Sequence, residues 1–178
     1  MDRVRKHWRK EFQDRDDLTG EHPLGDMGQL ILLGVFLIIW IADSFIFKYS
    51  TSLSEYVYIY IRIPVAVVIL FIAGWLARSG LKTVFGEKRE QPHVITTGAF
   101  GVVRHPIYFA SILVYLGLIL MTFSLFSVIV WLVIIVFYYF ISKYEEKLLL
   151  QRFGSEYEDY MKKIPMLFPL KIGNRKKP

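Results

Sequence analysis

The feature that most constrains this chain is a charge-free stretch of 36 residues, 107–142. A helix needs only about 20 apolar residues to cross the hydrocarbon core of a bilayer. The stretch is too long for one ordinary span, so it predicts an integral membrane protein and excludes a soluble domain. It divides best at residues 122–124, which predicts a tight helical hairpin of two short spans. We expect the second helix to continue out of the membrane through Glu145 and Glu146.

Two more apolar segments precede the hairpin, at residues 27–47 and 57–77. The sequence therefore predicts an all-α fold, an integral membrane helical bundle of about four transmembrane helices with a C-terminal cytosolic helical tail. Residues 1–26 form a charged leader with no apolar core, so they are not a cleavable signal. Apolar residues spaced i, i+4, i+8 leave open a short interfacial helix there: Val4, Trp8 and Phe12.

The basic residues predict the orientation of the bundle. With four spans, the N-terminus, the loop 78–105 and the C-terminal tail share one side, which holds every Lys and Arg except Lys48 and Arg62. The positive-inside rule places that side, with both termini, in the cytosol. Asp43 and Arg62 lie near the opposite interface, where we expect a structural ion pair or snorkelling.

The remaining composition limits the possible partners. The net charge of +6 is explained by cytosolic loops, so we predict no nucleic-acid partner. The chain has no cysteine, and its four histidines and its acidic residues show no metal-ligand spacing, so we predict no metal.

One constellation stands at the start of the third span. Pro106 suits the first position of a helix. Arg104 and His105 would then lie at an exposed helix N-terminus, where free backbone N–H groups favour an anion. Gly98 and Gly101, just upstream, let the backbone approach a ligand closely. The pattern is typical of a binding loop, and an Arg–His pair facing lipid phosphates is the alternative.

The second constellation is an acidic pair that follows the last span, near the depth of His105. Adjacent residues on a helix point about 100° apart. We therefore expect Glu145 to face the protein, and Glu146 to lie nearer the surface beside Lys143 and Leu150. A solvated acidic turn paired to lysines is the alternative.

The tail is predicted as helix, break and helix. Gly154 can end the first helix, and Ser155 with Glu158 forms a capping-box pattern for the second. Pro165 then stops that helix.

In this order, the motifs resemble the isoprenylcysteine carboxyl methyltransferase family and its phospholipid methyltransferase relatives, over about residues 92–169. The family pattern is a Thr-(Ser/Thr)-Gly turn, an Arg-His-Pro-x-Tyr helix start, a hydrophobic hairpin, Glu-Glu-x-x-Leu, and Phe-Gly-x-Glu-Tyr-x-x-Tyr ending in Pro. The chain carries these elements as Thr96-Thr97-Gly98, Arg104 to Tyr108, Glu145-Glu146 to Leu148, Phe153-Gly154-Ser155-Glu156-Tyr157 to Tyr160, and Pro165 and Pro169.

The resemblance implies a multi-pass membrane methyltransferase that uses S-adenosyl-L-methionine. It implies one membrane-embedded catalytic domain, 27–178, with its cofactor half at 92–169. The substrate would be a lipid or a prenylated small molecule or protein that enters from the bilayer. The family's histidine falls on Pro92, and His93 stands one place away. The implied cofactor residues are His93, Val94, Ile95, Phe100, His105, Tyr108, Phe109, Ala110, Ser111 and Glu145, and the implied catalytic residues are Glu145 and Arg104.

Two further departures from the family matter, and the second bears on the methyl acceptor. Phe100 stands where the family usually has Tyr, and Ile141 stands where its prenylcysteine members carry Arg. A carboxylate acceptor needs a cation, which Arg supplies bidentately. A protonated amine needs a carboxylate to accept its proton. Because Arg104 or Lys143 could supply a cation, a prenylcysteine carboxylate and an amino-phospholipid head group both stay open.

Two other classes of protein also stay open. One is a membrane-embedded, NADPH-dependent reductase of sterol-type lipids, although the loop shows no recognisable phosphate-binding set of Arg and Lys. The other is a non-enzymatic interaction or transport protein of the same fold. Thermal stabilisation by S-adenosylmethionine rather than by NADPH would separate these classes.

Overall fold

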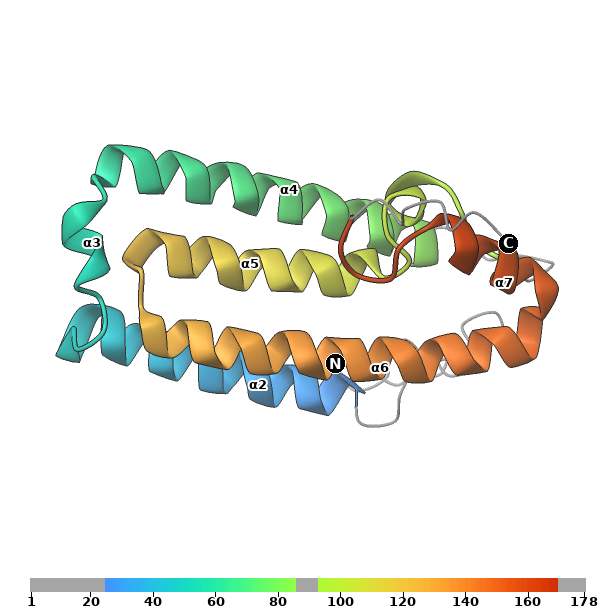
Figure 1. Cartoon of the computed structure of the whole chain (residues 1–178), viewed down its shortest axis with the longest axis horizontal. Coiled ribbons are helices and arrows are strands. Elements are labelled where there is room, and N and C mark those ends of the chain that lie inside the picture. The colour runs from blue at the N-terminus through green and yellow to red at the C-terminus, as the bar shows by residue number, and fades with distance from the viewer. Residues whose placement is uncertain (1–24, 86–92, 170–178) are drawn as a thin grey trace, which may run out of the picture.

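The computed structural model describes residues 25–85 and 93–169, and in this part of the chain every regular element is a helix (Figure 1). The leader up to residue 24, with its candidate interfacial helix, lies outside the described residues, as does Pro92. The elements are α2 (Gly25–Ile41), the π-helical turn η1 (Ala42–Phe47), α3 (Leu53–Tyr56), α4 (Ile59–Phe85), the 3₁₀ turn η2 (Gly98–Gly101), α5 (Pro106–Thr122), α6 (Leu125–Phe153) and α7 (Ser155–Lys163).

The predicted bundle of about four apolar helices is confirmed. Three segments are long and apolar enough to cross a membrane: Gly25–Phe47, Ile59–Val84 and Leu125–Phe153. The fourth, α5, has 17 residues and is therefore only about 25 Å long. Helix α4 continues to Phe85, so the first part of the predicted loop 78–105 is helical.

The hairpin breaks where the sequence predicts. Phe123 ends α5 in the left-handed conformation, and Ser124 caps α6 by accepting a hydrogen bond from the backbone N–H of Ser127. The 29 residues of α6 span about 43 Å, which exceeds the roughly 30 Å of a bilayer core. As predicted, α6 continues past Glu145 and Glu146, so these acids lie on its final third.

Helices α4 and α5 run side by side along the bundle and form its most extensive helix pair (Figure 1). Small residues recur at seven-residue spacing on both helices, at Ala66, Ala73 and Gly80 on α4 and at Ala110 and Gly117 on α5; all five are buried. Such residues let membrane helices approach closely, because apolar surface alone gives no driving force for association in lipid.

The two glycines among these five residues are required by the close approach of α4 and α5. A Cβ atom at Gly117 would lie 2.7 Å from the Leu70 side chain, and one at Gly80 would lie 2.9 Å from Ile107. Both distances are shorter than van der Waals contact. The two glycines therefore fix the spacing of α4 and α5 near opposite ends of α5.

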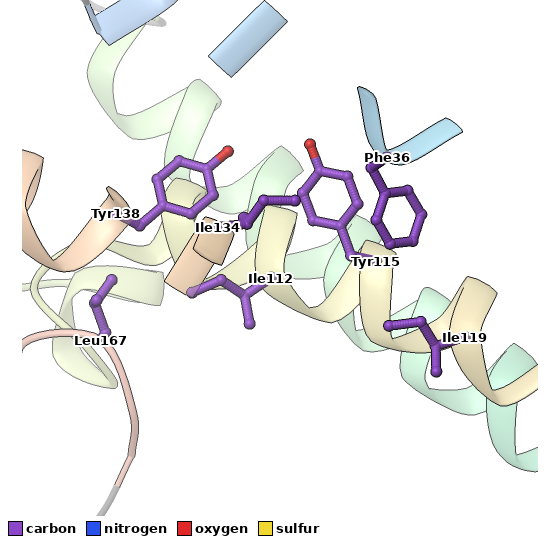
Figure 2. Packing of buried hydrophobic residues seen from close by; sticks show 7 residues of the cluster. All are labelled: Phe36, Ile112, Tyr115, Ile119, Ile134, Tyr138 and Leu167. Atoms are coloured by element: carbon purple, nitrogen blue, oxygen red, sulfur yellow. The ribbon is translucent and has the colours of Figure 1, made fainter. Parts of the chain in front are cut away.

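The central core lies where α2, α5 and α6 meet (Figure 2). Phe36 of α2 packs against Tyr115 of α5, with ring centroids 4.6 Å apart. Leu167, which follows α7, joins the same cluster, so the tail returns to the bundle. The buried members are Phe36, Ile112, Tyr115, Ile119, Ile134, Tyr138 and Leu167.

The predicted capping box at the start of α7 is wrong. Gly154, at φ +55°, occupies the cap position, and no side chain caps this helix. Ser155 is already the first helical residue, so its hydroxyl is not placed at the cap. The predicted break at Gly154 is confirmed, and the helix ends at Lys163, two residues before Pro165.

For Asp43 and Arg62 the sequence left open a structural ion pair or snorkelling, and the ion pair is not formed among the described residues. Asp43 accepts hydrogen bonds from the backbone N–H and the hydroxyl of Ser50, the former at 3.0 Å, and from the hydroxyl of Ser124 at 2.5 Å. These donors satisfy the carboxylate without a cation. Among the described residues, the buried Nε of Arg62 has no hydrogen-bond partner.

Candidate functional site

The predicted site lies where the start of α5 meets the final third of α6, α7 and the tail. The backbone N–H groups of Arg104 and His105 donate to the carbonyls of Pro165 at 2.9 Å and Met166 at 3.1 Å. His105 is only 8% exposed. The predicted exposed helix N-terminus is therefore wrong, because the tail covers it and takes both N–H groups.

Arg104 links three parts of the structure. Its Nε donates to Oε1 of Glu146 at 2.7 Å, and its Nη2 lies 2.7 Å from the same oxygen. Its Nη1 donates to the carbonyls of Met161 at 2.9 Å and Ile164 at 2.5 Å. These carbonyls are at the C-terminal end of α7, where unpaired carbonyls and the helix dipole favour a cation. The four contacts occupy most of the five N–H donors of a guanidinium.

His105 lies between two carboxylates. Its Nδ1 is 3.4 Å from Oε2 of Glu145, and its Nε2 is 3.4 Å from Oε1 of Glu146. Burial lowers the pKa of His105, but hydrogen bonding and charge attraction from Glu145 and Glu146 outweigh it, so its pKa is raised above 6.5. Despite these contacts, Nε2 has no hydrogen-bond partner of good geometry in the described part of the chain.

The expectation that only Glu145 faces inward is wrong. Glu146 is 5% exposed, and the Glu145 side chain is 12% exposed. The two side chains leave α6 in different directions, but the His105 ring presents one nitrogen to each of them. Glu146 is drawn inward because it is the counter-charge of Arg104. It is the more deeply buried of the two acids.

Glu145 also anchors a column of aromatic rings. The hydroxyl of Tyr108 donates to Oε1 of Glu145 at 2.5 Å. The Tyr108 ring stacks on His105 with centroids 5.7 Å apart, and on Tyr138 of α6 with centroids 5.0 Å apart. The first turn of α5 is thus joined to α6 by one carboxylate and by these stacked rings.

The segment between α4 and α5 joins the site through α7. The backbone N–H of Val94 donates to Oε1 of Glu156 at 3.1 Å, and Val94 packs in a buried cluster with Tyr160. The Tyr160 hydroxyl donates to the carbonyl of Phe100 at 2.7 Å. Two of the predicted cofactor residues, Val94 and Phe100, are therefore held beside α7.

The other predicted cofactor residues are more scattered. His93 is exposed and Ile95 is half-buried. Phe109 and Ala110 are buried in a second cluster, against α4 and η2, and Ser111 donates to a carbonyl of its own helix. The structure thus brings together four of the predicted residues closely: Arg104, His105, Tyr108 and Glu145.

Sequence reasoning missed the structural role of Glu146. The sequence shows a second acid next to Glu145, but this acid is identified as a counter-charge only once Arg104 is known to be buried, 42 residues away. The carbonyls of Met161 and Ile164 carried no signal in the sequence, since any residue supplies a carbonyl. No group of three or more His, Cys, Asp or Glu side chains within residues 25–85 and 93–169 could hold a metal ion.

These apolar helices define an integral membrane protein, and the buried ionic cluster forms a polar site at one end of the bundle. A family model described as phospholipid methyltransferase matches residues 61–156, which is more than half of the chain. The chain belongs to this family and is a membrane methyltransferase. The match confirms the resemblance seen in the sequence and extends it back to α4. No curated protein and no solved structure matches the chain.

Proposed function

We propose that the chain transfers a methyl group from S-adenosylmethionine to the amine of an amino-phospholipid head group. The observation that carries the choice of acceptor is the engagement of Arg104 by Glu146 and by the end of α7. A prenylcysteine carboxylate would need a free cation at this position. An amine needs a carboxylate, and Glu145 supplies one.

Apart from His105, which we assign below to the carboxylate of the cofactor, the described residues offer little to hold a carboxylate acceptor. Arg104 directs its guanidinium at protein acceptors, and Ile141 is buried and apolar where prenylcysteine-methylating relatives carry Arg. Lys143 is exposed and lies over the Tyr139 ring, 5.4 Å from its centroid. We therefore assign Arg104 a positioning role, in which it fixes Glu146 and the end of α7 around His105.

An amine acceptor suits the charges at Glu145. The carboxylate attracts an ammonium group and accepts one of its protons. S-adenosylmethionine, when bound, would supply an electrophilic methyl group to the neutral nitrogen, and the electron pair of the broken carbon–sulfur bond would stay on sulfur. Holding the two reactants in line is the main contribution of the protein, worth up to roughly 7–11 kcal/mol in well-oriented cases.

The residues at this site fit S-adenosylmethionine, which supplies an electrophilic methyl group on a sulfonium centre. The cofactor carries charges of both signs, and the cluster presents both the Glu145 carboxylate and the buried Nε2 of His105. This nitrogen is 3.4 Å from Glu146 but makes no hydrogen bond of good geometry among the described residues. Glu145 would face the positive groups of the cofactor, and His105 its carboxylate. Val94 and Phe100, held beside α7, would border it.

Two measurements on protein purified in detergent test this proposal. S-adenosylmethionine at 100 times its Kd should stabilise the fold by about 2.7 kcal/mol, and NADPH should not. Labelled methyl groups should reach phosphatidylethanolamine in mixed micelles and should not reach a prenylcysteine. Methylation of the prenylcysteine alone would refute the choice of acceptor.

Glu145→Gln tests the assigned base while keeping the shape of the side chain. We expect methyl transfer to fall about 10²-fold or more, because the amide cannot accept the proton. Glu158→Gln on α7, where the side chain is 61% exposed, is the matched control and should leave activity unchanged. Wild-type activity in Glu145→Gln would contradict the assignment.

We also propose that the end of the bundle with the ionic cluster faces the cytosol. Exposed basic residues near the membrane gather there, whereas Lys48 is at the other end. They are Arg78, Lys82, Lys143 and Lys147. Because the chain has no cysteine, single substitutions can report the two sides. In sealed vesicles of known orientation, a membrane-impermeant maleimide should label Ser52→Cys and Ser155→Cys from opposite sides, with Ser155→Cys cytosolic.

A further inference from the structure

Ser142 on α6 is fully buried, and its hydroxyl has no hydrogen-bond partner among the described residues. A serine inside a helix commonly donates to the carbonyl four residues earlier, but this one does not. A buried polar group without a partner is destabilising, so each such group in a folded protein calls for an explanation. The methyl-transfer roles assigned above do not use Ser142.

The position of Ser142 relates it to the ionic cluster. It lies three and four residues before Glu145 and Glu146, which places it on the same side of α6, one turn away. Tyr138 lies one helical turn before Ser142 and stacks on Tyr108, so this side of α6 meets the first turn of α5. Ser142 is thus between the acidic pair and the membrane-spanning part of the helix.

A second unpartnered polar atom lies close to the same acids. Nε2 of His105, a residue only 8% exposed, has no hydrogen-bond partner within the described residues, although it is 3.4 Å from Glu146. The α5 and α6 sides of the cluster therefore each contribute a buried polar atom that makes no hydrogen bond of good geometry within residues 25–85 and 93–169. Two such groups beside one acidic pair indicate a place for a polar ligand rather than a packing defect.

We infer that Ser142 binds the methyl acceptor, with its hydroxyl oxygen accepting a hydrogen bond from the acceptor's ammonium group. This inference rests on the proposed function and adds a residue that determines acceptor specificity. An ammonium group has several N–H donors, of which Glu145 accepts one and Ser142 accepts another. Ser142 is on the membrane side of the acids. Because it is fully buried, the side chains around it must move before a head group that enters from the bilayer reaches it.

The test compares Ser142→Ala with Ser127→Ala, a fully buried serine of the same helix whose hydroxyl bonds to Ser124 at 2.8 Å. Without ligand, Ser142→Ala should unfold at the same temperature as the wild type or higher, since it removes an unsatisfied group. Ser127→Ala should unfold at a lower temperature, because it loses a hydrogen bond that is made.

Kinetics give the second half of the test. Ser142→Ala should raise the KM for phosphatidylethanolamine about tenfold, as expected for one lost hydrogen bond to a charged group. Its thermal shift with S-adenosylmethionine should equal that of the wild type. Ser142→Cys keeps the shape of the side chain, with a larger atom that hydrogen-bonds more weakly, and it should give an intermediate KM.

The outcomes separate this inference from the proposed function. Wild-type KM in Ser142→Ala, with active enzyme, would overturn the role of Ser142 and leave the proposed function intact. A lower unfolding temperature in Ser142→Ala would also overturn it, by showing that the hydroxyl has a structural partner. Wild-type protein that binds S-adenosylmethionine but never methylates phosphatidylethanolamine would refute the proposed acceptor, and this inference with it.

Discussion

The buried pair of Arg104 and Glu146 is the contact in the cluster whose loss we expect to destabilise the protein most. Glu146→Gln keeps the shape of the side chain and removes its charge. The sequence alone predicted a surface acid there, whose exposed ion pairs would contribute about 0–1 kcal/mol. The structure instead buries both partners, with side chains only 8% and 7% exposed.

The magnitude follows from that burial. Removing one partner of a buried ion pair costs about 3–5 kcal/mol, because the other charge stays buried without compensation. The glutamine carbonyl can still accept one hydrogen bond, and two α7 carbonyls remain on the guanidinium. We therefore expect the lower end, about 3 kcal/mol. For a chain of this size each kcal/mol shifts Tm by about 2–4 °C, so Tm should fall by about 6–12 °C.

Thermal unfolding in detergent measures this effect, and two matched variants calibrate it. Glu145→Gln changes the neighbouring acid, which contacts His105 and Tyr108 but, among the described residues, no arginine. It should lower Tm by only about 2–4 °C, equivalent to about one net hydrogen bond. Glu158→Gln, on the surface, should change Tm little. Equal losses for Glu146→Gln and Glu145→Gln would refute the reasoning.

Three further predictions concern the rest of the bundle. Because the pKa of His105 is raised above 6.5, the stability from its imidazolium is complete below pH 6.5 and is lost as pH rises through the folded pKa. Wild-type Tm should therefore fall with rising pH above 6.5, and His105→Gln should flatten that slope; a wild-type Tm that rises would contradict it. Gly117→Ala should reduce the free energy of unfolding by about 1–3 kcal/mol through contact with Leu70, and so lower Tm. Gly34→Ala, with nothing within 4 Å among the described residues, should be neutral or stabilising. Asp43→Ala should destabilise by about 3 kcal/mol in the same assay, and a loss below 1 kcal/mol would show that its serine contacts contribute little.

Much of the helical architecture could be predicted from the sequence because its signals are local. The length of the charge-free run sets how many transmembrane helices it can form, and the first of its two helices ends at residues 122–124 as predicted. Pro106 begins α5 because proline has no backbone N–H. The N–H of the first helical residue has no partner within the helix, so nothing is lost there. Gly154 ends α6 because it adopts a positive φ easily.

The details of the site could not be predicted because they depend on distant contacts. The tail carbonyls that bind the N–H groups of Arg104 and His105 come from about 60 residues further along the chain, and backbone carbonyls leave no mark in a sequence. The inward turn of Glu146 likewise depends on where the Arg104 guanidinium lies. The recurrence of small residues every seven positions on α4 and α5 is visible in the sequence, but it does not show by itself that these two helices contact each other.

Glu145 and Glu146 both contact His105, but they differ in whether another charge already compensates them. With His105 protonated, the cluster holds two positive and two negative side chains: Arg104, His105, Glu145 and Glu146. In a water-poor site, this balance matters because an uncompensated charge is destabilising.

Under the proposed function, an ammonium group beside Glu145 adds a third positive charge and favours the loss of a proton. If the proton leaves the ammonium, the neutral amine that methyl transfer requires is formed. If it leaves His105, the neutral imidazole can accept the proton of the acceptor later. The pair of Glu146 and Arg104 cannot relieve the excess, because its charges compensate each other and are held by α7. Keeping one acid paired in this way leaves Glu145 and His105 as the groups that respond to the acceptor.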